Sequence, residues 1–198
     1  MDNISLIIMK KIIFFVTIFL LNKNIYAAEF SKAYFAGGCF WCMEESFDKV
    51  EGVVDTISGY SGGHLKNPTY QDVIYKDTGH VEAIKITYDS EKISYDQLLN
   101  IFWKNIDPFD KYGQFCDKGK SYRSVLFFQN NKQKKIIEKS INKIEKRFNS
   151  KVVTLVWEFD KFYDAEDYHQ DYHQKNFLKY LSYKKACQRE EILNLIWN

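Results

Sequence analysis

Prolines and long apolar runs are both scarce in this sequence. Its 198 residues include only two prolines, Pro68 and Pro108, and no internal repeats or low-complexity linkers. No segment therefore has the composition of a linker between domains. The longest apolar run, from Ile12 to Leu21, has ten residues with only Thr17 polar. That is about half of the roughly 20 residues that a membrane-spanning helix needs.

The apolar run belongs instead to a predicted secretory signal. Met9-Lys10-Lys11 supplies a positive start, and Ile25-Tyr26-Ala27-Ala28 offers small residues for cleavage. We expect residues 1–27 to be a signal peptide, with Met9 as an alternative start, and residues 28–198 to be one domain exported to the periplasm. An uncleaved membrane anchor is the alternative.

The mature chain carries no net charge. Cleavage after Ala27 removes 27 of the 198 residues and leaves 171; it takes Lys10, Lys11, Lys23 and Asp2 away, so 28 basic and 26 acidic residues become 25 of each. This balance gives no overall basic field for a nucleic acid. A local basic stretch, residues 132–147, has apolar residues at helical spacing, which predicts a solvated amphipathic helix.

Only four cysteines are present, Cys39, Cys42, Cys116 and Cys187, and all lie in the mature chain. They are too few for a small domain stapled by disulfides, and 17% aromatic residues supply a core without staples. In an oxidising compartment, catalytic use of these thiols requires a reducing partner.

The order of predicted elements indicates an α+β fold. We expect strands at 32–36, 53–58, 81–88, 121–128 and 152–159, helices at 40–50, 94–105 and 132–148, and a C-terminal tail. Ser94 and Gln97 are spaced as a capping box for the second helix. This βαββαβ order is the split βαβ of a ferredoxin-like sandwich. A doubly wound parallel sheet is the alternative, less favoured because no helix is predicted between the second and third strands.

Cys39 is the strongest candidate nucleophile. Gly37-Gly38-Cys39 lies between a predicted strand and a predicted helix, so the cysteine sits at a helix start, where unpaired N–H groups and the helix dipole favour a thiolate. We interpret the two glycines as opening the backbone to a ligand. A small buried core residue is the alternative.

An acid and several tyrosines lie on predicted strands and loops where they are candidates for catalysis. Glu82 shares strand parity with Ile84, Ile86 and Tyr88, so it is either an edge residue reaching solvent or a desolvated acid with a raised pKa. Asp117 and Tyr122 lie near a strand start, and Tyr70 follows a glycine-rich loop. A reactive thiol, a neutral acid and tyrosine hydroxyls suit attack on a small polar electrophile such as a sulfoxide.

Seven motifs in order resemble peptide methionine sulfoxide reductases of the A type, which act on the S epimer. The resemblance runs from about Lys32 to Asn176, and its motifs are Gly38-Cys39-Phe40-Trp41, Gly59-Tyr60-Ser61-Gly62-Gly63, Asn67-Pro68-Thr69-Tyr70, Thr78-Gly79-His80-Val81-Glu82, Asn105-Ile106-Asp107-Pro108, Tyr122-Arg123-Ser124 and Ala165-Glu166-Asp167-Tyr168-His169-Gln170.

The resemblance implies a role for each matching residue. Cys39 is the nucleophile that becomes a sulfenic acid, and Glu82 is the proton donor to the sulfoxide oxygen. Tyr70 and Tyr122 hydrogen-bond that oxygen, and Asp117 assists substrate binding. Phe40 and Trp41 receive the methyl group. No cofactor or metal is implied. The substrates are oxidised proteins and peptides or free methionine sulfoxide, and the chain is expected to be a monomer.

A second thiol must resolve the sulfenic acid as a disulfide, which an external dithiol such as thioredoxin then reduces. Cys187 is our first choice because it lies in a tail that we expect to move. Cys42 stands where most members of the family have glycine, and on a helix it would be held in place; Cys116 is the third candidate. The tail around Cys187 lacks the glycines that the family usually has there.

Two other functions remain open from the sequence. Cys39-x-x-Cys42 after a strand is the spacing of a thiol–disulfide oxidoreductase, for which Glu82 would be dispensable. The second alternative is an exported binding module in which the four cysteines bind structural zinc, although Cys116 and Cys187 form no second close pair in sequence. A zinc deaminase is disfavoured because its motifs would be reversed.

Overall fold

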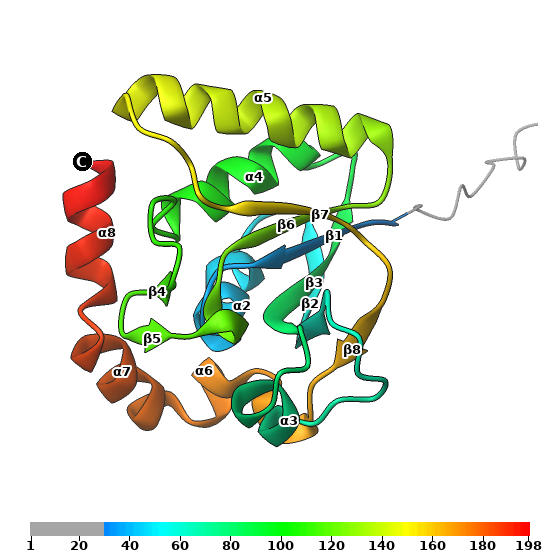
Figure 1. The fold of residues 1–198 in the computed structure, drawn as a ribbon, viewed down its shortest axis with the longest axis vertical. Coiled ribbons are helices and arrows are strands. Elements are labelled where there is room, and N and C mark those ends of the chain that lie inside the picture. The colour runs from blue at the N-terminus through cyan, green and yellow to red at the C-terminus, as the bar shows by residue number, and fades with distance from the viewer. Residues whose placement is uncertain (1–29) are drawn as a thin grey trace, which may run out of the picture.

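The computed structural model describes residues 30–198, so the predicted signal peptide lies outside the described residues. Within residues 30–198 the protein is a mixed α/β fold built on one curled, mixed six-stranded sheet (Figure 1). None of the helices in this part of the chain has the length and apolar character to cross a membrane.

The sheet has the order β7-β6-β1-β3-β2-β8. All neighbouring strands are antiparallel except β6 and β7, which are parallel. Its strands are β1 (Phe30–Ala36), β2 (Val53–Ser61), β3 (Val81–Asp89), β6 (Val125–Phe128), β7 (Leu155–Glu158) and β8 (Phe162–Asp164). A separate two-stranded hairpin pairs β4 (Gly113–Gln114) with β5 (Asp117–Lys118). Because β1 and β3 are central, residues at their ends lie in the middle of the molecule.

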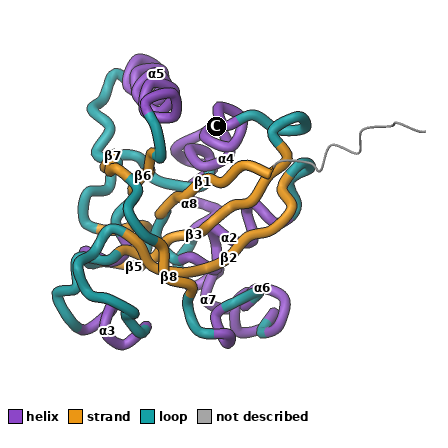
Figure 2. Tube along the Cα trace, turned by 90° about the vertical axis from the view of Figure 1, so that its right-hand side faces the viewer, coloured by secondary structure: helices purple, strands orange, loops and turns teal. Residues whose placement is uncertain are grey.

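Seven α-helices surround the sheet in the described residues. They are α2 (Phe40–Asp48), α3 (Tyr70–Tyr75), α4 (Tyr95–Lys104), α5 (Asn131–Phe148), α6 (Tyr172–Lys175), α7 (Phe177–Ala186) and α8 (Arg189–Trp197). Two 3-10 turns, Lys120–Tyr122 and Asp167–His169, complete the chain. Figure 2 shows the strands as a central layer, with α5 at one end and α3, α6 and α7 at the other.

The main core lies between the sheet and helices α2 and α4. Alternate residues of β3, such as Ile84 and Ile86, are fully buried there against Phe47 of α2 and Phe102 of α4. Because side chains alternate along a strand, Glu82 points to this same buried face. The opposite face carries a smaller cluster around Phe127, covered by the chain from β7 to β8.

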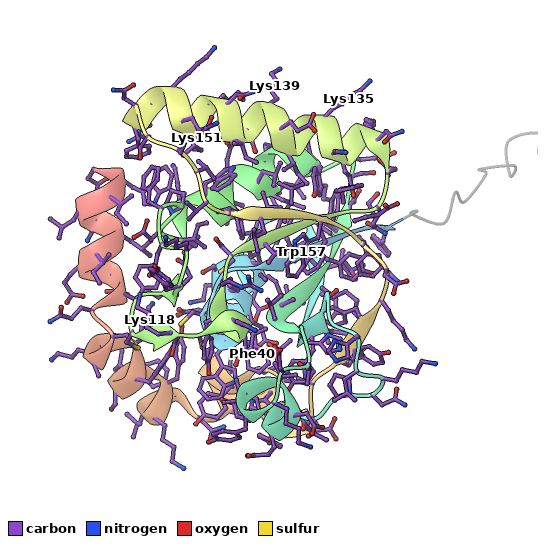
Figure 3. The ribbon with its side chains drawn as sticks, viewed as in Figure 1. Phe40, Lys118, Lys135, Lys139, Lys151 and Trp157 are labelled. Atoms are coloured by element: carbon purple, nitrogen blue, oxygen red, sulfur yellow. A yellow bond between two sulfur atoms is a disulfide. The ribbon has the colours of Figure 1, made fainter. Side chains whose placement is uncertain are left out.

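Local sequence explains where the predicted helices begin. The capping box at α4 is present, since the Ser94 side chain accepts from Gln97 N and the Gln97 side chain accepts from Ser94 N. Helix α5 is amphipathic as predicted: Ile137 is buried, whereas Lys135 and Lys139 point outward from the molecule (Figure 3).

Three predictions about the fold were wrong in detail. The strand expected at 121–128 covers only Val125–Phe128, because Lys120–Tyr122 forms a 3-10 turn. Helix α3, capped by Thr69 and Asp72, lies in the segment expected to hold no helix. The C-terminal tail is not loose: α7 and α8 are packed, and the Arg189 guanidinium donates to the Asn105 carbonyl at 2.6 Å while Trp197 Nε1 donates to the Ile106 carbonyl at 3.1 Å.

Candidate active site

A cavity of about 70 Å³ gathers the candidate residues. It is lined by Cys39, Phe40, Trp41, Tyr70, Glu82, Asp117, Tyr122 and Tyr183. Seven of these eight were selected from sequence, although they come from segments up to 83 positions apart, from Cys39 to Tyr122. Tyr183, on α7, is the one that sequence missed, because nothing distinguishes it among 14 tyrosines.

The central strands position Cys39 and Glu82 side by side. Cys39 is the N-cap residue of α2, directly after the turn that leaves β1, and its side chain caps no backbone group. Glu82 is the second residue of the neighbouring strand β3. The backbone N–H of Phe40, at the start of α2, donates to Glu82 Oε2 at 3.0 Å. The helix N-terminus therefore holds the carboxyl group beside the cysteine.

The glycine turn has a different cause from the one that we expected. A Cβ built at Gly38 would lie 2.5 Å from Gln114 Cβ, and one at Gly37 would lie 2.5 Å from Met43 Sδ. Gly38 also has a φ of +80°, which other residues rarely adopt. The close approach is thus made by the protein's own core, and the inference that these glycines open the backbone to a ligand was wrong.

The protonation of Cys39 also differs from the expectation. Cys39 does sit at a helix start, but it is only 4% exposed, and burial raises the pKa of its thiol well above the ordinary value. A hydrogen bond from Cys39 lowers the pKa of Cys42 to about 7. Because the two thiols interact, they titrate as a pair, and in the resting site the negative charge favours Cys42.

Glu82 is the desolvated acid of the two alternatives that sequence left open. It is 2% exposed, and burial raises its pKa to about 8, against the opposing effect of the hydrogen bond from Phe40. At neutral pH the carboxyl group is therefore protonated and able to donate.

Three hydroxyls and a second carboxyl complete the polar side of the cavity. Burial raises the pKa of Tyr70 to about 12 and that of Tyr122 well above its ordinary value, so both remain neutral donors. Tyr122 lines the cavity together with Tyr70 and Glu82. The Tyr183 hydroxyl donates to Asp117 Oδ2, and burial raises the pKa of Asp117.

The aromatic wall is fixed by a histidine. Trp41 stacks on Tyr172 with ring centroids 3.8 Å apart, and its Nε1 donates to Nδ1 of His169 at 3.2 Å. Burial lowers the pKa of His169 to about 4, so the imidazole is neutral and can accept this bond. The His169 ring also lies 4.9 Å from Phe40 and 4.5 Å from Tyr70. His169 was assigned no role from the sequence, where it appears only as part of the motif Ala165-Glu166-Asp167-Tyr168-His169-Gln170.

The four cysteines form two separate pairs. Cys116 and Cys187 are joined by a disulfide with a Cα–Cα distance of 5.0 Å, whereas Cys39 and Cys42 are free and buried. Their sulfurs do not converge on one point in the described residues, because the close group of potential ligands there is Cys116, Asp117 and Cys187 alone. The arrangement does not fit a zinc site with four cysteine ligands.

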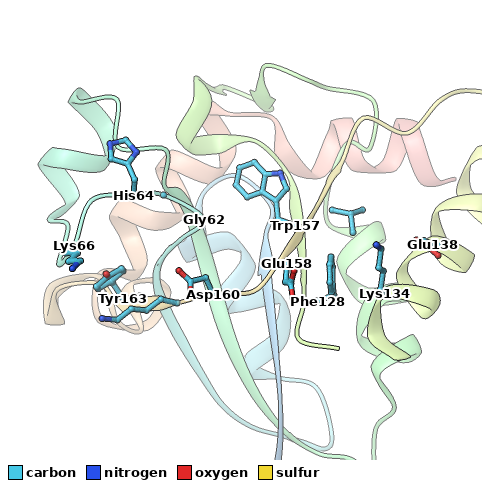
Figure 4. A pocket seen from close by; sticks show the side chains of 13 residues that line it. Gly62, His64, Lys66, Phe128, Lys134, Glu138, Trp157, Glu158, Asp160 and Tyr163 are labelled. Carbon is cyan, nitrogen blue, oxygen red and sulfur yellow. The ribbon is translucent and has the colours of Figure 1, made fainter. Parts of the chain in front are cut away.

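A larger hollow of about 750 Å³ lies away from these residues (Figure 4). It runs beside β7 between the Gly62–Lys66 loop and α5, and its lining mixes Lys134 and Lys161 with Glu158 and Asp160. None of the candidate residues lines it, and its charges are those of an ordinary mixed surface.

The buried carboxyl group predicts how stability depends on pH. The folded state keeps the Glu82 proton up to about pH 8, whereas an unfolded chain releases it near pH 4.5, so the folded state binds more protons in between. This contribution to the free energy of unfolding therefore falls as pH rises, by at most about 1.4 kcal/mol per pH unit. Urea unfolding should show that the free energy of unfolding of Glu82→Gln increases relative to that of the wild type from pH 5 to pH 8. Glu91→Gln, at an exposed turn, is the control; a Glu82→Gln difference that stays constant with pH would mean that Glu82 is ionised in the folded protein.

Comparison with known proteins agrees with the geometry. The family model for peptide methionine sulfoxide reductase matches residues 31–198. Peptide methionine sulfoxide reductase MsrA of Bacillus licheniformis is 46% identical over 167 residues, covering 83% of this chain and 92% of the relative. The MsrA of Ligilactobacillus salivarius is 46% identical over 168 residues, covering 84% and 97%.

Solved structures give the same relationship. Reduced Mxr1 from Saccharomyces cerevisiae has a TM-score of 0.71 and 30% identity, covering 76% of this chain and 87% of that one. Methionine sulfoxide reductase A of Corynebacterium diphtheriae has a TM-score of 0.67 and 29% identity, covering 74% and 75%. The chain belongs to the peptide methionine sulfoxide reductase family.

Proposed function

We propose that this protein reduces methionine-S-sulfoxide, in peptides and proteins or free, to methionine at the expense of an external dithiol. The observation that carries this function is the cavity in which the Cys39 sulfur, a protonated Glu82 and the Tyr70 and Tyr122 hydroxyls meet. Family membership gives the reaction, and the geometry supports a role for each residue.

The cavity suits the head of an oxidised methionine side chain. Its volume of about 70 Å³ is roughly that of two or three water molecules, enough for a sulfoxide and its methyl group. The methyl group would pack against Phe40 and Trp41, which are held by His169 and Tyr172. The sulfoxide oxygen would then face Glu82 and the two tyrosines, and only one epimer at sulfur satisfies both requirements.

The reaction follows from this placement. The Cys39 sulfur attacks the sulfoxide sulfur as thiolate, its proton having passed to Cys42 across the hydrogen bond that joins them. Glu82 protonates the oxygen while Tyr70 and Tyr122 donate hydrogen bonds to it, which makes the sulfur electrophilic. The oxygen ends on the Cys39 sulfur as a sulfenic acid, two electrons pass to the methionine sulfur, and methionine leaves. Asp117, oriented by Tyr183, would bind the substrate backbone.

An acid at position 82 also separates this function from the alternative of a thiol–disulfide oxidoreductase. Disulfide exchange between Cys39 and Cys42 requires no proton donor in the cavity, yet a buried, neutral carboxyl group lines it. Reduction of a sulfoxide does require a proton donor, for the sulfoxide oxygen. Reduction of a sulfoxide therefore explains Glu82, Tyr70 and Tyr122 together.

We also propose that β1, β2, β3 and β6 form a ferredoxin-like core with the additional strands β7 and β8 at its edges. The order β6-β1-β3-β2, with antiparallel neighbours and α2 and α4 as connections, supports this classification. An experimental structure in which β1 is an edge strand of these four would contradict it.

The first prediction concerns the nucleophile. With a dithiol present, the wild type should release methionine from the S epimer and leave the R epimer intact, and Cys39→Ser should release none. Chromatography of methionine from each epimer provides the measurement, with circular dichroism to verify that the variant is folded. Equal activity of the two proteins, or turnover of the R epimer alone, would refute the function.

The second prediction concerns the acid. Glu82→Gln keeps the side-chain volume but cannot donate a proton, so the rate of methionine release in a single turnover should fall by about 10²–10⁴-fold with little change in substrate affinity. The wild-type rate should also decline as pH rises through about 8, where Glu82 ionises, and the variant should lack that decline. An unchanged single-turnover rate would exclude Glu82 as the donor.

The third prediction concerns localisation, which residues 1–27 carry. We propose export to the periplasm with cleavage after Ala27, leaving a reductase domain of residues 28–198. Cell fractionation followed by mass spectrometry should find the shortened chain outside the cytoplasm. Recovery of only the full-length chain from the cytoplasm would contradict export, and recovery of it from the membrane would favour an uncleaved anchor.

A further inference from the structure

Cys42 lies directly beneath the reacting cysteine. It is 2% exposed and packs with Cys39 and Tyr180 in one buried cluster. Its backbone N–H donates to the Cys39 carbonyl at 3.2 Å, and the neighbouring Cys39 thiol lowers the pKa of the Cys42 thiol. Because Cys42 is held in contact, it needs no moving segment to reach Cys39. The rigidity that made Cys42 a second choice from sequence is therefore an advantage for the first step.

Cys187 is placed less favourably for that step. It is the C-cap residue directly after α7, where its N–H donates to the Tyr183 carbonyl at 3.0 Å, and its sulfur is bonded to Cys116. Neither Cys116 nor Cys187 lines the cavity. The positions facing Cys39 from these two segments are taken by Asp117 and Tyr183.

The two cysteine pairs differ in their access to solvent. Cys39 and Cys42 are 4% and 2% exposed, so a folded dithiol protein cannot reach either sulfur without rearrangement. Cys116 is exposed at the surface next to the hairpin of β4 and β5. An external reductant therefore meets the Cys116–Cys187 disulfide before it meets the reacting pair.

Arg189 contacts sequence neighbours of both cysteine pairs. It is 3% exposed, lies two residues after Cys187, and packs its guanidinium 4.4 Å from the Phe115 ring, which precedes Cys116. The same guanidinium contacts Met43 Sδ at 3.7 Å, next to Cys42. One buried side chain thus contacts Met43, which follows Cys42, and Phe115, which precedes Cys116.

We propose that oxidation leaves the active site in two stages: Cys42 resolves the Cys39 sulfenic acid, and the Cys116–Cys187 pair then takes over the disulfide and presents it to the external dithiol. This relay rests on the proposed function, since it requires the sulfenic acid. The state in the structure, with Cys39 and Cys42 free and Cys116 and Cys187 bonded, is the one that follows the second stage.

Each stage balances. In the first, the Cys42 sulfur attacks the Cys39 sulfur, an S–S bond forms, the S–O bond breaks, and the oxygen leaves as water. In the second, one thiolate of the reduced Cys116–Cys187 pair attacks the Cys39–Cys42 disulfide and the other completes the exchange, so two electrons pass inward and both active-site thiols are restored. The external dithiol then reduces Cys116–Cys187 and becomes a disulfide itself.

The test isolates the first stage. Reduced Cys116→Ser/Cys187→Ser protein is mixed with one equivalent of methionine-S-sulfoxide, without reductant, and trapped with dimedone, which labels sulfenic acids. The relay predicts one methionine per chain, loss of both remaining thiols, a Cys39–Cys42 disulfide in the peptide map and no dimedone adduct. Adding Cys42→Ser to these changes should slow the release of the one methionine, because the acceptor of the Cys39 proton is lost, and should leave a dimedone adduct on Cys39.

A wild-type measurement covers the case in which the double variant does not fold. Fully reduced wild type with excess sulfoxide and no reductant should release two methionines per chain and end with Cys39–Cys42 and Cys116–Cys187 disulfides. A Cys39–Cys187 disulfide, or a dimedone adduct on Cys39 beside a free Cys42 thiol, would overturn the relay. No methionine from any protein would instead reject the proposed function, which keeps the two failures distinct.

Discussion

The hydrogen bond from the Phe40 N–H to Glu82 joins helix α2, which carries the cysteine, to strand β3, which carries the acid. The arrangement of the site depends on this bond. It ties the first turn of α2 to the start of β3 at 3.0 Å, and so sets how the cysteine and the acid face one another. It also satisfies a helix N-terminal donor that would otherwise be unpaired in the core. The N-terminus of α2 thereby serves the acid more directly than it serves the thiol, which inverts the usual role of a helix start in a cysteine enzyme.

Burial governs the chemistry of the site more than charge does. It keeps Glu82 protonated, His169 neutral and the tyrosine hydroxyls intact, all of which the reaction with a neutral substrate requires. The same burial opposes ionisation of Cys39, whereas the pKa of the neighbouring Cys42 is lowered to about 7. In the mechanism that we propose, the Cys42 thiolate accepts the Cys39 proton, so a second sulfur close to the nucleophile serves proton transfer as well as redox chemistry.

The sequence was a good guide where local rules decide the structure. The capping box at Ser94 is a property of a short segment and was predicted correctly. Strand alternation placed Glu82 on the apolar face but left open whether it reached solvent, and the structure shows that it is buried. The predictions about the glycine turn and the C-terminal tail were wrong because both depend on contacts between distant segments. Gly37 and Gly38 are close to Met43 and Gln114, and Arg189 is anchored on Asn105, which no local pattern reveals. Tyr183 and the Cys116–Cys187 bond depend on the same long-range packing of α7.

The depth of Cys39 has a consequence for the substrates as much as for the enzyme. A cysteine that is 4% exposed and lines a cavity of about 70 Å³ accepts only a side chain that stands clear of its own backbone. An oxidised methionine packed inside a folded protein meets this requirement only while its surroundings are open. Repair of such a residue would then proceed at a rate set by local unfolding of the damaged protein. The narrow cavity thus makes the enzyme respond to a loss of packing around the oxidised residue, in addition to the oxidation itself.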